Sequence, residues 1–399
     1  MDKVLDVTIV GGLGHVGLPL GICLANEGLS VCLYDIDPDK ADLVQKGSMP
    51  FIEYGAEAIL KNVLKSGKLQ VSLNIDIVAK SKFIIIAIGT PIDEYLNPKT
   101  RAFLEICLQL KPYLDESQII IIRSTVYPNT PQQLQDLLSK DEEVRHVAYC
   151  PERIVQGYAI KELKELPQIV AALSDRALDE ASKLFSLLSP HIIQTSMKEA
   201  ELVKLFTNAW RYIQFAVTNQ FYMIAQTFGA DYDQVRHAMT EGYGRAASLP
   251  SAGFAAGPCL LKDTMQLTAF NHNNFLLGHT AMMINEGLPN FIVESLKRKY
   301  NLKNMRVGIL GMAFKADIDD IRDSLSYKLG KILRFNGADV LYSDEFAKDP
   351  TLISKEEIIK LSKIIIIGVP HSAYKGLLIP ETIELVDLWK ITKRDGERK

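Results

Sequence analysis

The stretch Val7-Thr-Ile-Val-Gly-Gly-Leu-Gly-His-Val-Gly17 joins a short β-branched run to a helical pattern near the start of the chain. Within it, Gly12, Gly14 and Gly17 follow the pattern G-x-G-x-x-G. In this pattern the first glycine permits a tight turn, the second lets a phosphate approach the backbone, and the third lets helix and strand pack closely. A helix start also offers N–H groups and a partial positive charge to an anion. The stretch therefore predicts a phosphate-binding loop between a strand and a helix.

An acidic residue makes this loop a dinucleotide signature. Asp35 ends the next strand-like run, Val31–Tyr34, at the expected separation of about 20 residues from the glycines. A carboxylate there accepts hydrogen bonds from ribose hydroxyls and repels a 2′-phosphate, so NAD is favoured over NADP. A glycine-rich turn of another α/β fold is the alternative interpretation.

Short apolar runs alternate with helical stretches through the first third of the chain. Leu18–Asn26 and Ala41–Gln45 carry helical spacing, and they lie among runs that we predict to be strands: Val7–Val10, Val31–Tyr34, Phe83–Ile88, Ile119–Ile122 and Val147–Tyr149. Strand–helix alternation of this kind indicates a parallel, doubly wound sheet.

The pattern changes near residue 198. No Pro or Gly interrupts Lys198–Phe228, where apolar residues recur at intervals of three and four: Leu202, Leu205, Phe206, Ala209, Ile213 and Ala216. This predicts one helix much longer than the usual three to four turns. We expect a spine between domains and a dimer seam, with a plain core helix as the alternative. Strand-like runs return after Met305: Arg306–Leu310, Ala338–Tyr342, Lys363–Val369 and Ile383–Asp387.

The predicted fold class is α/β, with two Rossmann-like doubly wound parallel-sheet domains joined by a long-helix central domain. We place the NAD-binding domain at residues 1–195, the helical central domain at 196–300 and the smaller C-terminal domain at 301–399. At about 150 residues per domain, the length agrees with two or three domains. The charged end, Thr392–Lys399, is expected to be frayed.

Composition excludes several classes of protein. Lys and Arg number 45 and Asp and Glu 48, a net charge of −3, so bulk electrostatics give the chain no hold on nucleic acid. The five cysteines form no Cys-x-x-Cys pair and the seven histidines show no metal-ligand spacing, so we predict neither disulfides nor a metal site. No apolar stretch reaches the roughly 18 residues of a membrane span. Without a recognisable signal peptide, we expect a cytoplasmic protein that binds no membrane.

The segment Gly253-Phe-Ala-Ala-Gly-Pro-Cys-Leu-Leu-Lys-Asp263 singles out one cysteine. Cys259 follows a loop of small residues at a predicted helix start, where the helix dipole and Lys262 favour a thiolate. Asp263 lies four residues on, on the same helical face. A single cysteine is more often a buried small hydrophobe, and we assign that role to the cysteines within apolar runs: Cys23, Cys32, Cys107 and Cys150.

Two further groups are weaker candidates from spacing alone. Lys204 and Asn208, four apart on the long helix, would offer an ammonium and an amide to an oxyanion. A surface lysine and a helix-disturbing asparagine explain the same spacing. Glu152 and the pair Ser124-Thr125 each follow a predicted strand, where open α/β sheets place their ligands.

A second glycine-containing loop follows the run Arg306–Leu310. Gly311 precedes Phe314, Lys315 and Arg322, a set suited to phosphate, but the full G-x-G-x-x-G is missing. The loop is therefore a candidate for a nucleotide other than NAD. A structural loop with solvated charges is the alternative.

Taken in order, these motifs resemble the UDP-glucose/GDP-mannose dehydrogenase family of nucleotide-sugar 6-dehydrogenases, over nearly the whole chain. The resemblance rests on the glycine loop with Asp35-Ile-Asp37, on the Cys259 loop with Lys262-Asp263, and on these segments: Ala87-Ile-Gly-Thr-Pro91, Ser124-Thr-Val126, Pro151-Glu152, Glu201-Leu-Val-Lys-Leu205 with Asn208, Ala313-Phe-Lys-Ala-Asp317 and Asp319-Asp-Ile-Arg-Asp-Ser324.

The resemblance implies NAD-dependent, four-electron oxidation of a sugar C6 alcohol to a carboxylate. Cys259 would trap the C6 aldehyde as a thiohemiacetal, and a second oxidation would give a thioester that water releases. Lys204, Asn208 and Asp263 would stabilise the oxyanion and hold the water. Glu152 would be the general acid/base of hydrolysis, and Thr125 would help to position the water.

The same resemblance assigns binding residues. Those implied for NAD are Gly12, Gly14, His15, Val16, Gly17, Asp35, Lys40, Thr90, Thr125, Lys262 and Arg322. Those implied for the nucleotide sugar are Glu152, Arg153, Lys204, Asn208, Arg245, Phe254, Gly257, Phe314 and Lys315, with Lys315 on the UDP phosphates in the C-terminal domain. Arg245 is expected to reach the substrate of a neighbouring subunit in a homodimer built on the helix 198–228.

Two departures from the family pattern leave the sugar open. The cysteine loop carries Ala255, Ala256 and Pro258 where the family is richer in glycine, and Gln156 stands where a second carboxylate is usual. UDP-glucose is the default substrate, UDP-N-acetylglucosamine and UDP-N-acetylmannosamine are alternatives, and GDP-mannose is less favoured. The rival classes are a two-electron NAD dehydrogenase of the hydroxyacid or 6-phosphogluconate type, and a nucleotide-sensing protein without turnover.

Overall fold

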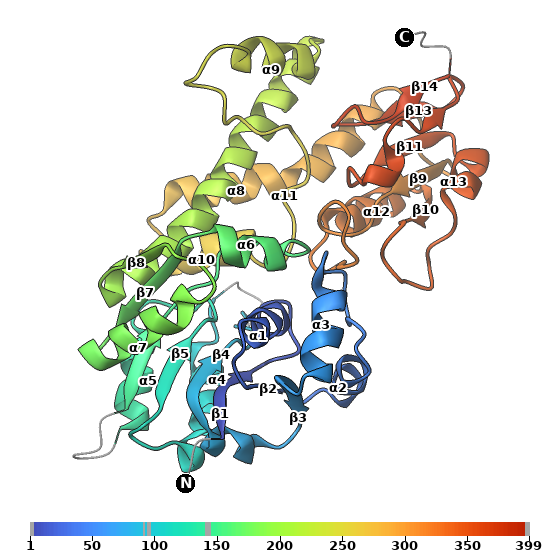
Figure 1. Ribbon diagram of the computed structural model, residues 1–399. Helices are drawn as coiled ribbons and strands as arrows, with labels where there is room; N and C mark the ends of the chain where they lie inside the picture. The colour runs from blue at the N-terminus through green and yellow to red at the C-terminus, as the bar shows by residue number, and fades with distance from the viewer. Residues whose placement is uncertain (1–3, 91, 94–96, 140–144, 396–399) are drawn as a thin grey trace. The chain divides into compact units, whose positions relative to one another are not determined.

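The computed structural model describes residues 4–90, 92–93, 97–139 and 145–395. Pro91, the last residue of one motif above, lies outside them. The chain divides into two compact units, residues 1–207 and 208–399. It passes from one to the other within a long helix, α8 (Met197–Phe228) (Figure 1). The domain boundaries at 195 and 300 stay predictions.

The first unit is built on an eight-stranded sheet in the order β3-β2-β1-β4-β5-β6-β7-β8. Its strands are β1 (Leu5–Val10), β2 (Val31–Tyr34), β3 (Leu69–Ser72), β4 (Ser81–Ile86), β5 (Ile119–Ile122), β6 (His146–Tyr149), β7 (Gln168–Ala172) and β8 (Ile192–Gln194). Strand order reverses between β1 and β4, and ligands of open α/β sheets bind beyond the strand ends at such a point. The glycine loop therefore begins at the switch point.

Helices cover both faces of this sheet (Figure 1). One face carries α1 (Gly17–Asn26), α2 (Pro38–Gln45), α3 (Ala56–Lys65), α6 (Ala159–Glu165) and α7 (Asp175–Ser186). The other carries α4 (Thr100–Leu108), α5 (Thr130–Leu138) and the short turns η1 (Ile75–Lys80) and η2 (Lys111–Tyr113).

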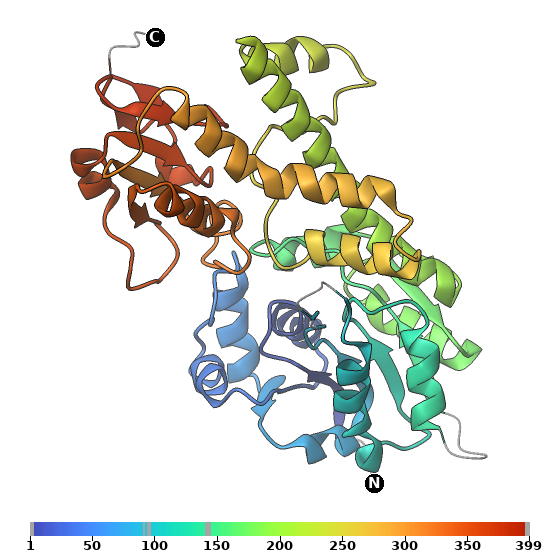
Figure 2. The same cartoon turned by 180° about the vertical axis from the view of Figure 1, so that it is seen from behind.

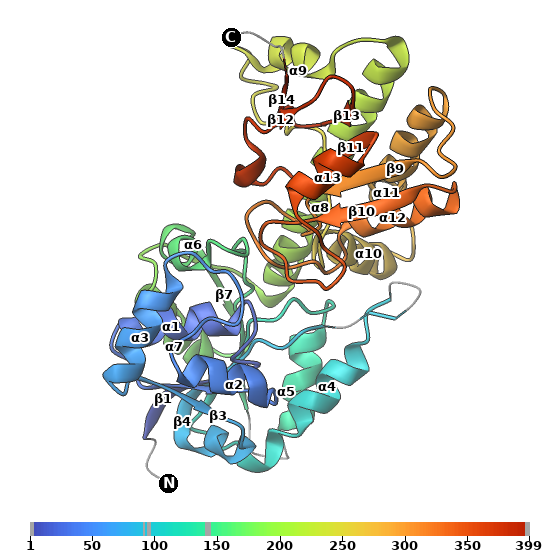
Figure 3. The same ribbon diagram turned by 90° about the vertical axis from the view of Figure 1, so that its right-hand side faces the viewer.

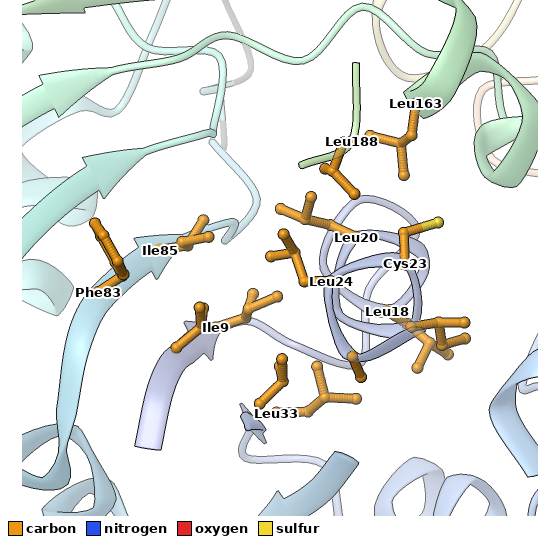
Figure 4. Packing of buried hydrophobic residues seen from close by; sticks show 14 of the residues in the cluster. Ile9, Leu18, Leu20, Cys23, Leu24, Leu33, Phe83, Ile85, Leu163 and Leu188 are labelled. Atoms are coloured by element: carbon orange, nitrogen blue, oxygen red, sulfur yellow. The ribbon is translucent and has the colours of Figure 1, made fainter. Parts of the chain in front are cut away.

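Alternate residues of the central strands pack into two hydrophobic cores, one on each face of the sheet. Phe83 and Ile85 of β4 pack on the α1 side, where Leu20 and Leu24 lie over the strands (Figure 4), whereas Ile84 packs on the α4 side. Burial on both faces explains why β4 and β5 are continuous apolar runs instead of alternating ones.

The doubly wound sheet predicted from the sequence is confirmed, with one difference in strand direction. Neighbouring strands are parallel except β6 and β7, which run antiparallel. Such a reversal near one edge of a parallel sheet is common. Three strands were not predicted from the sequence: β3, β7 and β8. They are short and lie at or near the edges of the sheet.

The second unit continues α8 into α9 (Tyr232–Thr240), α10 (Leu260–Phe270) and α11 (Leu276–Lys297), with α10 and α11 side by side (Figure 2). A four-stranded parallel sheet follows in the order β10-β9-β11-β13 (Figure 3). Its strands are β9 (Arg306–Leu310), β10 (Asp339–Ser343), β11 (Ile364–Ile367) and β13 (Glu384–Val386). The helices α12 (Leu325–Phe335) and α13 (Lys355–Leu361) cover opposite faces.

The end of the chain is more ordered than expected. The strand β14 (Lys393–Arg394) pairs in parallel with β12 (Leu378–Ile379), after the short turn η3 (Ser372–Tyr374). The expectation that Thr392–Lys399 is frayed is therefore wrong as far as Arg394, while 396–399 lie outside the described residues. Across the described part of the chain, no helix is long and apolar enough to cross a membrane.

Candidate active site

The glycine loop has the shape of a dinucleotide cradle. A Cβ on Gly12 would lie 2.8 Å from the Ile9 carbonyl oxygen, and one on Gly17 would lie 2.4 Å from the Gly11 carbonyl oxygen. A Cβ on Gly14, by contrast, would meet only the Gly11 carbonyl oxygen, at 3.5 Å. Gly14 therefore faces space that a phosphate can fill. The left-handed turn is made by Gly11, with φ of +76°, and not by Gly12 as the motif suggested.

Asp35 lies beside this cradle at the end of β2. Its Oδ2 accepts a hydrogen bond from the Leu13 N–H at 2.9 Å, and its Oδ1 accepts one from the Ile36 N–H at 2.8 Å. The Asp37 N–H donates to the same Oδ1 at 3.3 Å. An ionised carboxylate has about four acceptor positions, so about one stays open to a ribose hydroxyl. Lys40 is exposed and pairs with Asp37 at 3.1 Å; hydrogen bonds from the backbone and side chain of Lys40 lower the pKa of Asp37.

His15 connects the glycine loop to a later segment. Its ring lies 3.9 Å from the Phe51 ring, centroid to centroid, and Gln156 Nε2 lies 2.8 Å from His15 Nδ1. Gln156, where the family pattern has a carboxylate, thus touches the loop expected to hold pyrophosphate. The remaining NAD candidates of this unit are half-buried: Val16 at the N-terminus of α1, Thr90 after β4 and Thr125 after β5.

A buried arginine that sequence reasoning missed organises the ends of β5 and β6. Arg123 is 1 % exposed. Its guanidinium donates to Glu152 Oε2 at 2.5 Å, to Gln168 Oε1 at 2.8 Å and to the Cys150 carbonyl oxygen at 2.9 Å. The signal in the sequence was a charged residue directly after four isoleucines.

Both carboxylate oxygens of Glu152 accept hydrogen bonds within the first unit. Its Oε1 accepts hydrogen bonds from the N–H groups of Arg153 and Ile154, at 2.7 and 3.0 Å, and its Oε2 accepts one from Arg123. Arg153 in turn donates to the Pro167 carbonyl oxygen, and burial lowers the pKa of Arg153. Glu152 is thus positioned at a strand end as predicted, while its acid/base role stays a prediction.

The start of α8 is fastened to the loop after β5. Glu201 Oε1 accepts a hydrogen bond from the Asn129 N–H at 2.9 Å, and burial raises the pKa of Glu201 to about 7. Lys204, one turn later, is 8 % exposed. Both side chains are buried, which excludes the interpretation of Lys204 as a surface lysine.

Cys259 differs from the other cysteines. It precedes α10 as its N-cap residue and is exposed, whereas Cys23, Cys32, Cys107 and Cys150 are buried. Burial raises the pKa of each of these four thiols to about 12, as expected for cysteines that serve as small hydrophobes.

A buried carboxylate lies one turn beyond Cys259. The Asp263 N–H donates to the Cys259 carbonyl oxygen at 2.8 Å. Asp263 is fully buried, its Oδ2 accepts a hydrogen bond from Asn208 Nδ2 at 2.6 Å, and its Oδ1 lies 3.5 Å from Lys262 Nζ. The structure therefore brings Asn208, which the sequence offered separately, against the Lys262-Asp263 pair of the cysteine segment.

The loop after β9 packs against the cysteine loop. The Gly257 N–H donates to the Asp323 carbonyl oxygen at 3.3 Å, and a Cβ on Gly257 would lie 2.5 Å from Phe314 Cδ2. Hydrogen bonds to Asp320 raise the pKa of Arg322. Its assignment to NAD stays a prediction.

Three predicted substrate residues of the second unit have different surroundings. Phe254 meets the Trp389 ring edge to face at 6.4 Å. Arg245 is exposed, with its guanidinium carbon 5.8 Å from the centre of the Tyr243 ring. Lys315 is half-buried in the loop after β9.

A histidine that sequence reasoning set aside holds the loop after β9. His371 is fully buried; its Nε2 lies 3.0 Å from Asp344 Oδ2, and its Nδ1 accepts a hydrogen bond from the Asp317 N–H at 2.9 Å. Burial by itself raises the pKa of Asp344, but hydrogen bonds from His371 and from backbone N–H groups outweigh it and hold that pKa well below the usual range. Within the described residues, no group of three or more His, Cys, Asp or Glu side chains is placed to hold a metal ion.

Comparison with protein families covers most of the chain. The NAD binding domain of the UDP-glucose/GDP-mannose dehydrogenase family matches residues 5–188, the central domain 198–286 and the UDP binding domain 308–394. The glycine cradle and Asp35 fit the NAD that this family uses.

Relatives and solved structures agree with the family. The chain is 30 % identical over 371 residues to a UDP-N-acetyl-D-mannosamine dehydrogenase of Methanocaldococcus jannaschii, with 92 % of this chain and 86 % of the relative covered. The structure of UDP-D-ManNAc dehydrogenase from Pyrococcus horikoshii is similar with a TM-score of 0.86 and 27 % identity, over 98 % of this chain and 99 % of that one.

The fold is also shared with a UDP-glucose dehydrogenase from Pyrobaculum islandicum, at a TM-score of 0.88 and 23 % identity over 98 % of this chain and 97 % of that one. Sequence motifs, paired sheets and family matches thus lead to one conclusion: the chain belongs to the UDP-glucose/GDP-mannose dehydrogenase family and is an NAD-dependent nucleotide-sugar dehydrogenase.

Proposed function

We propose that this chain oxidises the C6 hydroxymethyl group of UDP-N-acetyl-D-mannosamine to the carboxylate, in a four-electron reaction that passes through Cys259. The observation that carries the chemistry is the exposed Cys259 thiol at the start of α10, one turn from the buried Asp263–Asn208 pair. The sugar is supported by relatives 30 % identical whose printed substrate is UDP-N-acetyl-D-mannosamine. This alternative replaces UDP-glucose as the first choice.

The chain's own residues supply a balanced covalent cycle. When bound, NAD supplies a hydride acceptor. Loss of a hydride and a proton from the C6 alcohol first gives an aldehyde. The Cys259 sulfur then adds to the aldehyde carbon, and the aldehyde oxygen takes the proton that the thiol gives up, which forms a thiohemiacetal. Loss of a hydride and a proton from this adduct gives a thioester. Water then adds to the thioester carbon, the carbon–sulfur bond breaks, and the carboxylate and the free thiol result.

Neighbouring side chains have separate roles in the proposal. Lys204 and Asn208 donate to the oxygen that becomes negative when sulfur or water adds. Asp263 orients Asn208 through the 2.6 Å hydrogen bond and accepts from water. Glu152 is the proposed acid/base of hydrolysis, positioned by Arg123, and Thr125 places the water.

Substitution of the cysteine tests this function directly. Cys259→Ser should lower turnover by at least about 10³-fold, because a serine hydroxyl is a far weaker nucleophile than a thiolate, while the Kd for NAD stays unchanged. Cys107→Ala, which removes a buried thiol of α4, is the matched control and should keep its turnover.

One assay of NADH formation measures both the NADH yield per sugar and which nucleotide sugar the enzyme prefers. The wild-type enzyme should form two NADH for each UDP-N-acetyl-D-mannosamine, at a higher kcat/KM than with UDP-glucose or UDP-N-acetylglucosamine. One NADH per sugar, or full turnover of Cys259→Ser, would reject the covalent cycle. Preference for UDP-glucose would reject only the sugar.

A homodimer is part of the proposal. From Trp210 to its end, α8 exposes large apolar side chains along one stripe: Trp210, Val217, Phe221, Ile224 and Phe228. An apolar hollow at its end is lined by Ile224 and Phe228 together with Phe291 of α11. A stripe of this length on a helix surface marks an interaction site, and a second copy of the same stripe is the proposed partner. A cytoplasmic location is also part of the proposal, because the five cysteines are scattered and odd in number, which is not the pattern of a secreted disulfide framework.

A further inference from the structure

Gly253 opens the loop that leads to Cys259, and one buried side chain holds both of its backbone groups. The Gly253 N–H donates to Asn219 Oδ1 at 2.9 Å, and Asn219 Nδ2 donates to the Gly253 carbonyl oxygen at 3.0 Å. Asn219 lies on α8 and is fully buried. Because a backbone N–H can only donate, this pairing fixes which end of the amide is the oxygen.

The second amide hydrogen of Asn219 is used as well. Asn219 Nδ2 donates to Asn285 Oδ1 at 2.9 Å, and Asn285 Nδ2 donates to the Tyr212 carbonyl oxygen at 3.0 Å. Asn285 lies on α11 and is fully buried. The two amides therefore join α8, α11 and the start of the loop. A buried polar network whose members are satisfied makes its surroundings rigid.

The far end of the same loop has anchors of its own. Gly257 has a φ of +100° and packs its backbone against the Phe314 ring, and its N–H donates to the Asp323 carbonyl oxygen. Cys259 follows as the N-cap residue of α10, and its carbonyl oxygen accepts from Asp263. The loop is thus held at Gly253 by Asn219 and again at Gly257, and these two anchors restrict the path by which the chain enters α10.

We propose that Asn219, oriented by Asn285, is a positioning residue that sets the place of the Cys259 thiol. The inference rests on the proposed function, in which the sulfur forms a bond to the aldehyde carbon. A displacement of about 1 Å at a reacting group costs up to about 10²-fold in rate. Neither amide touches the thiol, so each acts through the backbone at Gly253.

Asn219→Asp is the substitution that tests this proposal. It keeps the shape of the side chain but replaces the donor with an oxygen facing the Gly253 carbonyl and Asn285 Oδ1. We expect kcat to fall about 10²-fold, with the Kd for NAD unchanged. An aldehyde that is captured slowly escapes, so a hydrazine reagent should trap it and the NADH yield should fall below two per sugar.

Two control variants separate positioning from stability. Asn285→Asp is also a buried substitution and loses the bond to Tyr212, but it keeps the acceptor for Asn219; it should lower the melting temperature and still yield two NADH per sugar. Gln226→Glu makes the same chemical change at an exposed position of α8 and should match the wild type. If Asn219→Asp does not fold, Asn219→Ser, whose side chain is too short to bridge Gly253, takes its place.

The outcomes are distinct. An Asn219 variant that forms two NADH per sugar at the wild-type rate overturns the proposal. A loss of yield that Asn285→Asp reproduces in full also overturns it, because the effect is then one of stability. Failure of the proposed function is recognised separately, since Cys259→Ser would then retain its turnover whatever the Asn219 variant does.

Discussion

Two aspartates in equivalent places of the two sheets have different partners. Asp35 follows β2 and accepts one hydrogen bond from the glycine loop. Asp344 follows β10 and accepts from Met312 and Ala313 of the loop after β9, and from His371. Asp344 has little acceptor capacity left for a ribose, whereas Asp35 has some. This difference at one residue explains why the first sheet suits NAD and the second suits another nucleotide.

Asp35→Ser should narrow the preference for NAD over NADP about tenfold, because roughly 1–2 kcal/mol of repulsion against a 2′-phosphate is removed. The measurement is the ratio of kcat/KM for the two cofactors. Asp39→Ser removes an exposed carboxylate of α2 and is the control. An unchanged ratio in Asp35→Ser would mean that Asp35 does not face the ribose.

The residue that we propose to react was easier to predict than the residues that hold others in place. Cys259 was separable from four other cysteines because a loop of small residues and a helix start surround it. Arg123 and His371 gave no comparable signal, since their partners Glu152 and Asp344 lie 29 and 27 positions away in the chain. Contacts over such separations follow from the fold and not from any local pattern.

Arg123→Met should lower the free energy of unfolding by about 3–5 kcal/mol, because it leaves the buried Glu152 carboxylate without its cation. Urea denaturation measures this loss. The double variant Arg123→Met/Glu152→Gln removes the uncompensated charge and should recover part of it. Equal instability of the single and double variants would mean that the ion pair is not the source of the effect.

At the scale of elements, the long helix was the safest prediction. The sequence placed it at Lys198–Phe228, and α8 spans Met197–Phe228, since nothing in that stretch interrupts a helix. Edge strands were the least predictable: β3 has only four residues and is partly exposed, so its pattern is weak. The antiparallel direction of β7 depends on which neighbour it meets, which local sequence does not specify.

Glu201 couples α8 to the β5 loop in a pH-dependent way. Its pKa is raised from 4.5 to about 7 in the folded chain. Between these pH values the folded state therefore binds more protons than the unfolded state. The contribution of Glu201 to the free energy of unfolding falls as pH rises from about 4.5 to 7. Glu201→Gln keeps the acceptor for Asn129. The free energy of unfolding of Glu201→Gln, relative to that of the wild type, should therefore rise by up to about 3 kcal/mol from pH 5 to pH 8.

Urea midpoints of the two proteins at pH 5 and pH 8 measure this difference. Glu199→Gln is the control on the same helix. Hydrogen bonds from Thr195 and Ser196 lower the pKa of Glu199 below 4.5. Its contribution to stability therefore changes only at more acidic pH, and the difference between Glu199→Gln and the wild type should stay nearly constant between pH 5 and pH 8. A constant difference between Glu201→Gln and the wild type at both pH values would contradict the coupling.

At the scale of the whole molecule, the same strand–helix architecture is used twice, and the helix between the sheets has an apolar stripe that its own chain leaves exposed. Phe228 is 87 % exposed and Ile224 58 %, and a contiguous apolar patch of this kind is typical of an interaction site. The double variant Ile224→Asp/Phe228→Asp places two charges in the stripe. If a second copy covers it, light scattering should show a dimer for the wild type and a monomer of 44.5 kDa for the variant. Thr227→Asp, a single charge beside the stripe, should weaken the dimer less, and a wild type that is monomeric at micromolar concentration would exclude this interface.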